Sequence, residues 1–308
     1  MGHRRAKLGR ISDLDLRLLR VFQAVAECRG LTAAELRLGI SRSTISTYLA
    51  DLEMRMGTRL CERGRQGFEL TGDGVRVYQA ATELMSSLNN FQDEIESLGD
   101  SARGRIRVAV VDSFVWADEL RLSDGLKNFT TANPEVHLDL YVFHPDEIER
   151  RIDEGKIDIG ITSVHDYSRR FDYIPLLTLS SFLYCGAGHK LFGVKDEDIS
   201  DSDLNNTSYS SRWYGPTPAL LGQNPDIAQV ESFHIEATAH LILSGNYVGF
   251  LPENYAKHWV SKSEMRPIRK DLYRLDYRYG FSSKQGRQMS AAGKAFIDCV
   301  VRVVRRAA

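Results

Sequence analysis

Long apolar runs are absent from this 308-residue sequence. A helix that crosses a bilayer needs roughly 20 consecutive apolar residues, and no stretch approaches that length. Residues 1–12 are basic, but no apolar segment follows them, so we expect no secretory signal, no membrane partner and a cytoplasmic location. The hydrophobic content of 43% is ordinary for a folded chain, and the length allows about two or three domains.

Cysteine is scarce as well. The four residues, Cys28, Cys61, Cys185 and Cys299, lie far apart and form no CxxC pair. Such spacing offers neither a zinc cage nor a disulfide framework. We therefore expect buried thiols in a reducing compartment, no metal site and no cofactor.

The short motifs of common enzyme classes are also missing. The sequence contains no GxSxG, HExxH or GxxxxGK[ST] motif, and Gly186 and Gly188 begin a GxGxxG pattern that lacks its third glycine. Serines, histidines and acids are plentiful, but no spacing assembles them into a triad. We expect no catalytic activity.

Charge is nearly balanced over the chain but unevenly distributed. Residues 1–70 contain 13 Arg or Lys and 8 Asp or Glu, which gives +5. Because the whole chain carries −1, residues 71–308 carry −6. A basic segment on an acidic body indicates an attached nucleic-acid-binding module, although a solvated basic surface would have the same composition.

Residues 12–56 have the spacing of three helices. Ser12 is followed by Asp15, which is a capping-box pattern for a helix start. A second helix is predicted to begin at Thr32 and to end before Gly39. Ser41 can then cap a third helix.

The third predicted helix has two distinct faces. Ile45, Leu49, Leu52 and Met56 recur at helical spacing and form one stripe for burial. The opposite face carries small or polar side chains, namely Arg42, Ser43, Ser46, Thr47 and Ala50. Such a face can lie close to a DNA groove, where Arg pairs with guanine and hydroxyls reach phosphates or bases. Spacing alone leaves open an ordinary three-helix bundle with a solvated polar face.

The next segment favours the DNA-binding interpretation. Residues 58–71 read as two short strands around Gly64 and Gly67, with Arg63 and Arg65 near the tip. A hairpin that carries arginines beside a recognition helix is a wing that can reach a phosphate backbone or a minor groove. The sequence therefore predicts a winged helix-turn-helix module at residues 12–71.

Residues 19–74 resemble the DNA-binding domain of LysR-type transcription regulators. The matching positions are Phe22, Thr32, Ala33, Ala34, Ser46, Leu52, Glu53, Gly57, Leu60, Arg63, Leu70, Thr71 and Gly74. Two departures affect which bases are read: Arg42 stands where the family often has glutamine, and Glu35-Leu36 where a second alanine is usual. The residues expected on double-stranded promoter DNA are Thr32, Arg42, Ser43, Thr44, Ser46, Thr47, Arg63 and Arg65.

Residues 72–99 are predicted to form a linker helix. Its apolar residues alternate at spacings of four and three, as in a coiled-coil seam: Val77, Ala81, Leu84, Leu88, Phe91, Ile95 and Leu98. The alternative is a helix packed on its own domain. A regular seam beside a half-site reader favours a homodimer, and the resemblance implies the same, with pairs of dimers forming a homotetramer.

The remaining two-thirds predicts an α/β unit. Strands are expected at 105–111, 136–143 and 157–162, and helices at 113–130 and 147–154. Strands that alternate with helices imply parallel βαβ units, whose ligands bind beyond the carboxyl ends of the strands.

The family resemblance extends across this unit through NPEVHLDL, YCGAGHKLF and LILSGNYVGFLPE. It implies an effector-binding domain at residues 104–308 that resembles a periplasmic binding protein, with two α/β subdomains. Subdomain I takes in about 104–182 and 286–308, and subdomain II about 183–285. The chain is expected to cross between them near 178–186 and 279–290, so that the C-terminal helix returns to subdomain I.

Family positions also give candidates for a small-molecule effector cleft. They are Ser113, Phe114, His144, Ser163, Ser210, Ser211, Arg212, Ser232, Phe233 and His234. Arg212 offers a fork that can clamp a carboxylate, and Ser113 a hydroxyl at a helix start, which favours an anionic effector. The alternative is a neutral or apolar effector against Phe114 and Phe233. Pro145 stands where the family often has Ser or Thr, so a contact there is not expected.

Together these features predict a LysR-type regulator that binds promoter DNA, responds to an effector and contacts RNA polymerase. The rear domain alone would fit a solute-binding protein, but the basic N-terminal module and the absent export signal argue against that class. Thiol switching of the kind known in this family needs two nearby cysteines in subdomain II, and residues 190–298 contain none.

Overall fold

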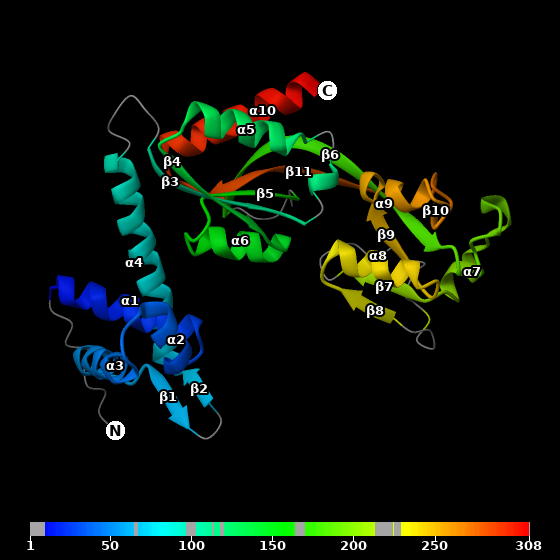
Figure 1. Cartoon of the computed structure of the whole chain (residues 1–308). Coiled ribbons are helices and arrows are strands. Elements are labelled where there is room, and N and C mark those ends of the chain that lie inside the picture. The colour runs from blue at the N-terminus through cyan, green and yellow to red at the C-terminus, as the bar shows by residue number, and fades with distance from the viewer. Residues whose placement is uncertain are drawn as a thin grey trace. The chain divides into compact units, whose positions relative to one another are not determined.

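A computed structural model describes residues 10–64, 67–96, 103–112, 114–117, 120–163, 170–212, 224 and 229–307. The chain divides into two compact units, Met1–Gln92 and Asp93–Ala308, and each is described by itself (Figure 1). Within the described ranges, no helix combines the length and the apolar character that a membrane crossing requires.

The first unit is a three-helix bundle with a two-stranded wing and a long helix. Its elements are α1 (Asp13–Glu27), α2 (Leu31–Leu38), α3 (Arg42–Met56), β1 (Cys61–Gly64), β2 (Gly67–Leu70) and α4 (Gly72–Glu96). The predicted helix ends are confirmed. The hydroxyl of Ser41 accepts the Thr44 N–H at 3.3 Å at the start of α3. Gly39 and Gly57 end α2 and α3 with φ of 65° and 72°, a left-handed conformation that glycine adopts without strain.

The core of this unit comes from the predicted apolar stripes. Leu18 and Phe22 of α1 and Leu49 of α3 are fully buried together. The wing is anchored to α3, because the Glu53 carboxylate accepts the backbone N–H of Leu60 at 2.8 Å and of Cys61 at 3.2 Å. This contact explains why an acid belongs at that position of the family pattern.

An ion pair joins the beginning of α1 to the end of α3. The Asp15 carboxylate, with 1% of its side chain exposed, receives Arg55 through Nε at 2.5 Å and Nη2 at 2.8 Å. The same carboxylate accepts the backbone N–H and the hydroxyl of Ser12. One side chain therefore caps α1 and also fixes the position of α3 relative to it.

The long helix α4 divides the expected dimer seam into two parts. Ala81 lies in the core of the first unit, and Val77 and Leu84 pack against that core. Further along, Phe91 and Ile95 are 64% and 49% exposed. The first half of the seam thus packs on its own domain, which heptad spacing could not reveal, and only the second half presents free apolar surface.

The second unit has a nine-stranded sheet in the order β4-β3-β5-β11-β6-β9-β7-β8, with β10 paired to β6. Its strands are β3 (Gly104–Val110), β4 (Val136–Val142), β5 (Ile159–Ser163), β6 (Phe171–Gly186), β7 (Tyr209–Arg212), β8 (Gln229–Ser232), β9 (Val248–Pro252), β10 (Met265–Pro267) and β11 (Arg274–Lys284). Its helices are η1 (Phe114–Trp116), α5 (Leu122–Ala132), α6 (Pro145–Asp153), η2 (Asp196–Asp198), α7 (Asp201–Asn205), α8 (Ile235–Leu243), α9 (Glu253–Val260) and α10 (Ala291–Ala307).

One predicted element was wrong. A single helix was expected over 113–130, but the structure has the short η1 and then α5. Ala117 and Leu120 are both buried in the core, and the Leu120 N–H donates to the Ala117 carbonyl at 3.0 Å. Arg121 then adopts φ 45°, a left-handed conformation from which α5 begins anew.

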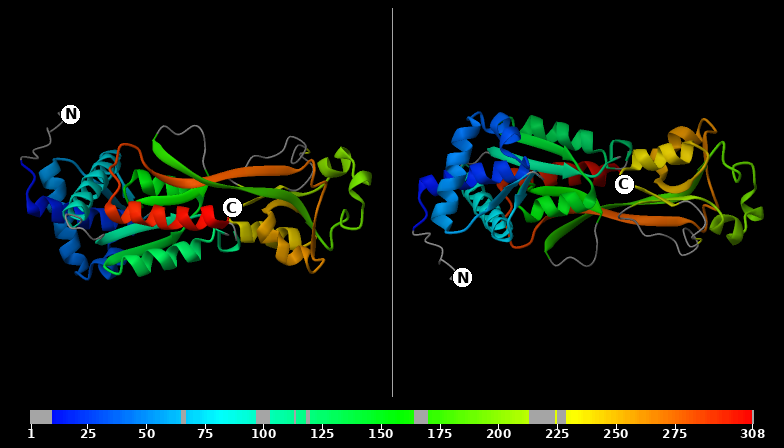
Figure 2. Two further views of the ribbon diagram at one scale, coloured as in Figure 1. Left: turned by 90° about the horizontal axis from the view of Figure 1, so that it is seen from above. Right: turned by 90° about the horizontal axis from the view of Figure 1, so that it is seen from below.

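Two long antiparallel strands, β6 and β11, connect the subdomains of this unit. Within the pair, β11 bonds to β5 at 279–282, whereas β6 bonds to β9 at 181–185. Residues 279–282, which lie in the expected crossing region, therefore bond to the sheet of subdomain I. As predicted, α10 returns to subdomain I. The ring centroids of Phe296 on α10 and Phe129 on α5 lie 5.4 Å apart. These two helices cover one face of the sheet, and α6 covers the other (Figure 2).

The Asp15–Arg55 pair gives a first prediction. Hydrogen bonds from Ser12 and then from Arg55 lower the pKa of Asp15 to about 2. The carboxylate's contribution to stability is therefore complete above the unfolded pKa of about 4 and is lost as pH falls toward 2. Asp15→Asn should lower the unfolding free energy of the first unit by about 1–3 kcal/mol at neutral pH.

Hydrogen exchange of α1 and α3 amides in the full chain measures this loss, with the exposed neighbour change Asp13→Asn as control. Equal protection of the two variants would show that the ion pair does not stabilise the unit.

Candidate nucleic-acid interface and effector cleft

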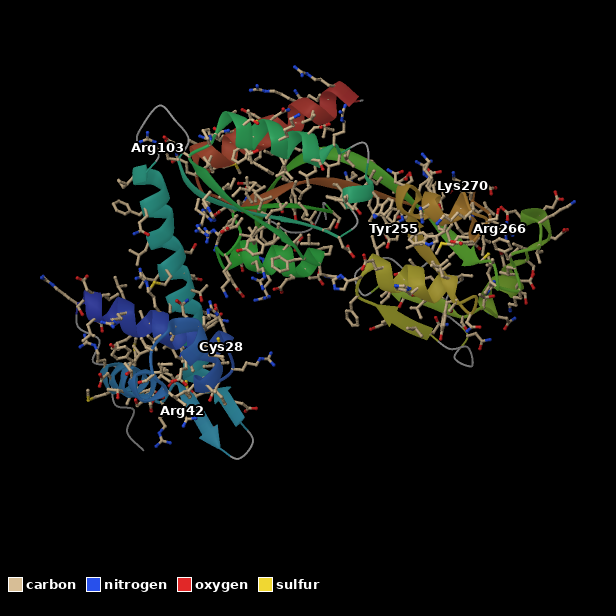
Figure 3. The ribbon with its side chains drawn as sticks, viewed as in Figure 1. Cys28, Arg42, Arg103, Tyr255, Arg266 and Lys270 are labelled. Carbon is tan, nitrogen blue, oxygen red and sulfur yellow. The ribbon has the colours of Figure 1, made fainter. Side chains whose placement is uncertain are left out.

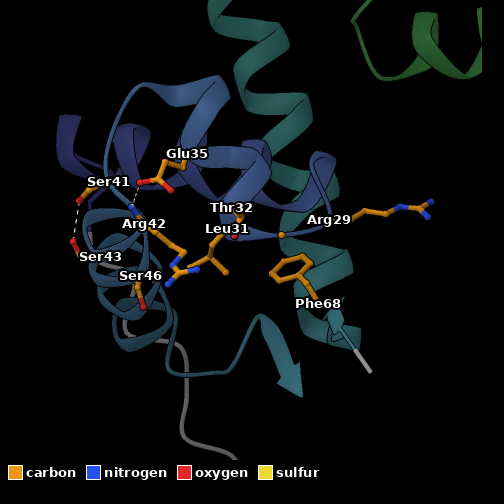
Figure 4. A pocket seen from close by; sticks show the side chains of 10 residues that line it. Arg29, Leu31, Thr32, Glu35, Ser41, Arg42, Ser43, Ser46 and Phe68 are labelled. Atoms are coloured by element: carbon orange, nitrogen blue, oxygen red, sulfur yellow. Dashed lines mark hydrogen bonds between the residues drawn. The ribbon is translucent and has the colours of Figure 1, made fainter. Parts of the chain in front are cut away.

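An open hollow of about 1050 Å³ lies on the surface of the first unit, beside the start of α3 (Figure 4). It collects side chains from α2, α3 and the wing. The lining residues are Arg29, Gly30, Leu31, Thr32, Glu35, Ser41, Arg42, Ser43, Ser46 and Phe68. Four of the predicted DNA contacts, Thr32, Arg42, Ser43 and Ser46, thus share one surface.

Arg42 is the most prominent group in the hollow. Its backbone N–H donates to the Glu35 carboxylate at 3.0 Å, which secures the first turn of α3. Its side chain extends into the hollow between Ser46 and Leu31 (Figure 4). Among the described residues, no carboxylate forms an ion pair with the Arg42 guanidinium. Five N–H donors are therefore available to a base or a phosphate.

The other hydroxyls of α3 have local partners. Ser43 and Thr44 hydrogen-bond the Ser41 hydroxyl at 2.9 and 2.8 Å, and Thr47 donates to the Ser43 carbonyl at 3.1 Å. Thr44 and Thr47 do not line the hollow. A hydroxyl can donate in one direction and accept in another, so these bonds leave capacity for a ligand.

The wing is described only in part. Arg63 lies on β1 opposite Phe68 of β2, but its side chain and all of Arg65 fall outside the described residues. Phe68 and Arg29 also line the hollow, although sequence reasoning missed both. A signal existed for Arg29, a basic residue directly before the turn that opens α2. Gly74 lies very close to the residue that precedes the wing. A Cβ atom at this position would lie 2.0 Å from the Leu60 carbonyl oxygen, which explains why the family pattern has glycine there.

In the second unit, a hydrogen bond joins the strand end of one subdomain to a helix start of the other. Asp112 follows β3, and its carboxylate accepts the N–H of Ile235 at the start of α8 at 2.8 Å. His234, the N-cap of α8, places its Nδ1 3.5 Å from the same carboxylate. Asp112 therefore ties subdomain I to subdomain II.

His144 caps α6 on the other side of this cluster. Burial lowers the pKa of His144, and nearby His234 lowers it further, while Asp146 and Asp112 act in the opposite direction. The net direction favours the neutral imidazole near neutral pH. The structure thus brings together His144 and His234, which were predicted, and Asp112, which was not. Asp112 follows a strand as Ser113 does, so the rule that selected Ser113 would have found it.

Two predicted cleft residues are buried and hydrogen-bonded to each other. Ser210 and Ser232 are 1% and 2% exposed, and Ser232 hydrogen-bonds Thr238 at 2.7 Å and the Ser211 carbonyl at 3.1 Å. Their hydroxyls satisfy one another between β7, β8 and α8. Such buried mutual bonding is the mark of a structural cluster.

The remaining cleft candidates differ in exposure. Phe114 is buried against the Tyr279 ring at 4.9 Å, and Ser163 is buried at the end of β5. Phe233 is 54% exposed. Ser113 and the side chain of Arg212 lie outside the described residues.

The cysteines are free thiols in this structure. Cys185 is fully buried in subdomain II, and burial raises its pKa to about 11. Since the thiolate is the reactive form, this side chain is a poor candidate for redox chemistry.

Comparison with known proteins decides the family. The profile of the bacterial regulatory helix-turn-helix protein, lysR family, matches residues 16–75, and the profile of the LysR substrate binding domain matches residues 99–305. The chain belongs to the LysR family of transcription regulators. The HTH-type transcriptional activator BauR of Pseudomonas aeruginosa is 33% identical over 298 residues, which cover 96% of this chain and 98% of that protein.

Solved structures share the fold of this LysR-family protein. Full-length CbnR complexed with its target DNA has a TM-score of 0.62 at 22% identity, covering 95% of this chain and 99% of that one. Full-length LysG of Corynebacterium glutamicum with bound effector Arg has a TM-score of 0.53 at 17% identity, covering 94% and 98%. The family has a DNA-binding domain joined to an effector-binding domain, so the solute-binding alternative is not favoured.

The hollow gives a prediction about sequence recognition. Arg42→Ala should weaken binding to the cognate promoter by about 1–3 kcal/mol and relax the preference at one base pair, because a bidentate Arg–guanine contact is lost. Mobility shifts on cognate and scrambled duplexes measure the two affinities. Arg302→Ala, an exposed change in the second unit, is the control. An unchanged ratio of specific to non-specific binding would remove Arg42 from the base-reading set.

Proposed function

We propose that this LysR-family protein binds promoter DNA sequence-specifically through the hollow beside α3, and that a small-molecule effector alters that binding. The observation that carries the proposal is the convergence of Thr32, Arg42, Ser43 and Ser46 on one surface next to the wing. Residues from two helices and a hairpin meet there, as a groove-reading helix with a backbone-contacting wing requires.

The contacts divide by role. Arg42 and Ser43, in the first turn of α3, are proposed to touch base edges. Thr32, Thr44, Ser46 and Thr47 supply hydroxyls for phosphates or bases, and Arg29 adds positive charge at the rim of the hollow. Arg63 and Arg65 of the wing are proposed to contact the backbone or the minor groove. Removal of the Arg65 side chain would weaken binding to all DNA sequences by a similar factor.

The protein is proposed to act as a homodimer, with pairs of dimers forming a tetramer. Support for the dimer comes from Phe91 and Ile95, which are exposed on one linker helix at a spacing of four. Support for a second interface comes from the edge strand β4, where Leu140 and Val142 are 44% and 60% exposed. Unpaired apolar strands and helices are surfaces that monomers rarely leave uncovered.

The effector is proposed to be a small carboxylate that binds the cleft between the subdomains. The N-terminus of α8 attracts anions, and in this structure the Asp112 carboxylate occupies it. An incoming carboxylate, clamped by Arg212, would replace Asp112 there and release one tie between the subdomains. The effector can shift the angle between the subdomains only if it binds the arrangement without the Asp112 bond more tightly than the arrangement with it.

The altered angle would change the spacing of the two recognition helices, and with it the DNA bend and the regulator's contact with RNA polymerase. Activation is the proposed outcome, because the 33%-identical relative BauR is an activator. The proposal also places the protein in the cytoplasm and assigns it no catalytic activity. An uncharged effector is the second candidate, favoured by the exposed ring of Phe233.

The dimer proposal predicts that Phe91→Asp combined with Ile95→Asp abolishes tight promoter binding, because charge would enter an apolar interface. These positions are chosen because Leu84 packs on its own domain, so its substitution would damage folding as well. Analytical ultracentrifugation gives the assembly state, and Leu272→Asp, at another exposed apolar residue, is the control. An intact dimer in the double variant would place the interface elsewhere.

The effector proposal predicts opposite effects of two changes. Arg212→Ala should weaken carboxylate binding by tenfold or so, since a charged fork is lost. Asp112→Asn should tighten it, because a competitor for the α8 N-terminus is weakened. Calorimetric screening of carboxylates against the three proteins decides. An effector that is uncharged, or that binds Arg212→Ala as tightly as wild type, rejects the carboxylate while leaving the regulator assignment intact.

A further inference from the structure

A second cavity, of about 130 Å³, lies beside the crossing strands of the effector-binding unit. Its walls come from η1, from the middle of β6 and β11, and from the start of α9. Of the predicted effector-cleft residues that the structure describes, Phe114 lines it, and neither His234 nor Asp112 at the start of α8 does.

Four aromatic rings dominate the walls. Trp116 meets Tyr255 with centroids 6.0 Å apart and planes at 87°, and Phe114 meets Tyr279 at 4.9 Å and 73°. Phe114, Tyr255 and Tyr279 are buried, whereas Trp116 is 44% exposed (Tyr255 is labelled in Figure 3). Four rings in two edge-to-face pairs thus line one small space, and aromatic cages that hold ammonium groups are built from such rings.

One carboxylate lies among the described lining residues. Glu253 lines the cavity, and no lysine or arginine is among the described residues that line it. Burial raises the pKa of Tyr255 to about 12, and the nearby carboxylates of Glu236 and Asp112 raise it as well. Lys270, which does not line the cavity, forms an ion pair with the Glu253 carboxylate and balances part of its negative charge.

We propose that this cavity binds an organic ammonium group, held by the faces of Trp116, Tyr255 and Phe114 and by the Glu253 carboxylate. A positive charge over aromatic faces is attracted by their quadrupoles, and the attraction strengthens where water is excluded. The volume of about 130 Å³ corresponds to about four water-sized groups, which suits a small quaternary or alkyl ammonium head.

The position of the cavity gives the site a regulatory meaning. Trp116 belongs to subdomain I and Tyr255 to subdomain II, and Tyr279 lies on a strand that crosses between them. A ligand that contacts Trp116, Tyr255 and Tyr279 together stabilises the angle between the subdomains at which these three rings lie around the cavity. The cavity would thus act on the same motion as the cleft effector, with a ligand of opposite charge.

The test is calorimetric titration of the full-length protein with choline and with dimethylbutanol, its uncharged carbon isostere. Saturable choline binding is expected, with the isostere at least about fivefold weaker, because only the charge differs. Trp116→Leu should weaken choline by about fivefold or more, and Trp116→Phe should retain most of the affinity since a ring face remains. Trp116 is half exposed, so neither change threatens the core.

The control is Val260→Ala, which trims an exposed apolar side chain that does not line the cavity and should leave choline binding unchanged. Promoter binding by all variants should match wild type in the absence of ligand. Absence of saturable choline binding, equal binding of the isostere, or wild-type affinity in Trp116→Leu would each overturn the ammonium site.

Discussion

The pairing of β6 with β11 is the constraint on which the effector-binding unit depends. The ladder runs from the pair Arg274–Phe182 to the pair Lys284–Phe171, and so belongs to both subdomain sheets. The subdomains can change their angle only by bending or twisting these two strands. The register shifts once, between Tyr279 and Gly280, and such irregularities are where strands bend most easily.

Both proposed ligand sites lie close to this ladder. Tyr279 lines the aromatic cavity and also pairs with Ser163 at the end of β5. Asp112 follows β3, the neighbour of β5, and reaches across to α8. A twist of the ladder therefore changes the geometry of the cavity and of the Asp112 contact together. Two small sites can in this way bias one motion without direct contact with each other.

The sequence predicted best what depends on local signals. Ser12 with Asp15, Ser41 and the glycines after α2 and α3 define helix ends through bonds within a few residues, and these ends were confirmed. The winged module and the two-subdomain effector domain follow from such elements in order, and the family match agrees with both.

What the sequence could not predict depends on long-range packing. Heptad spacing in α4 suits either a partner helix or the core of its own domain, and Ala81 and Leu84 turned out to pack on their own domain. Ser210 and Ser232 fit the polar pattern of a binding site, yet they bond each other inside the fold. Asp112 resembles an ordinary loop acid until α8, more than a hundred residues later, supplies its partner N–H.

The central claim is that this LysR-family protein acts at specific promoters, and chromatin immunoprecipitation of the full-length chain tests it most directly. We expect enrichment confined to a small set of promoter regions that share two half-sites about one helical turn, or a multiple of it, apart. The genes beside those sites would also indicate the effector's chemistry. Uniform enrichment along the chromosome, or enrichment without a shared sequence, would contradict the account.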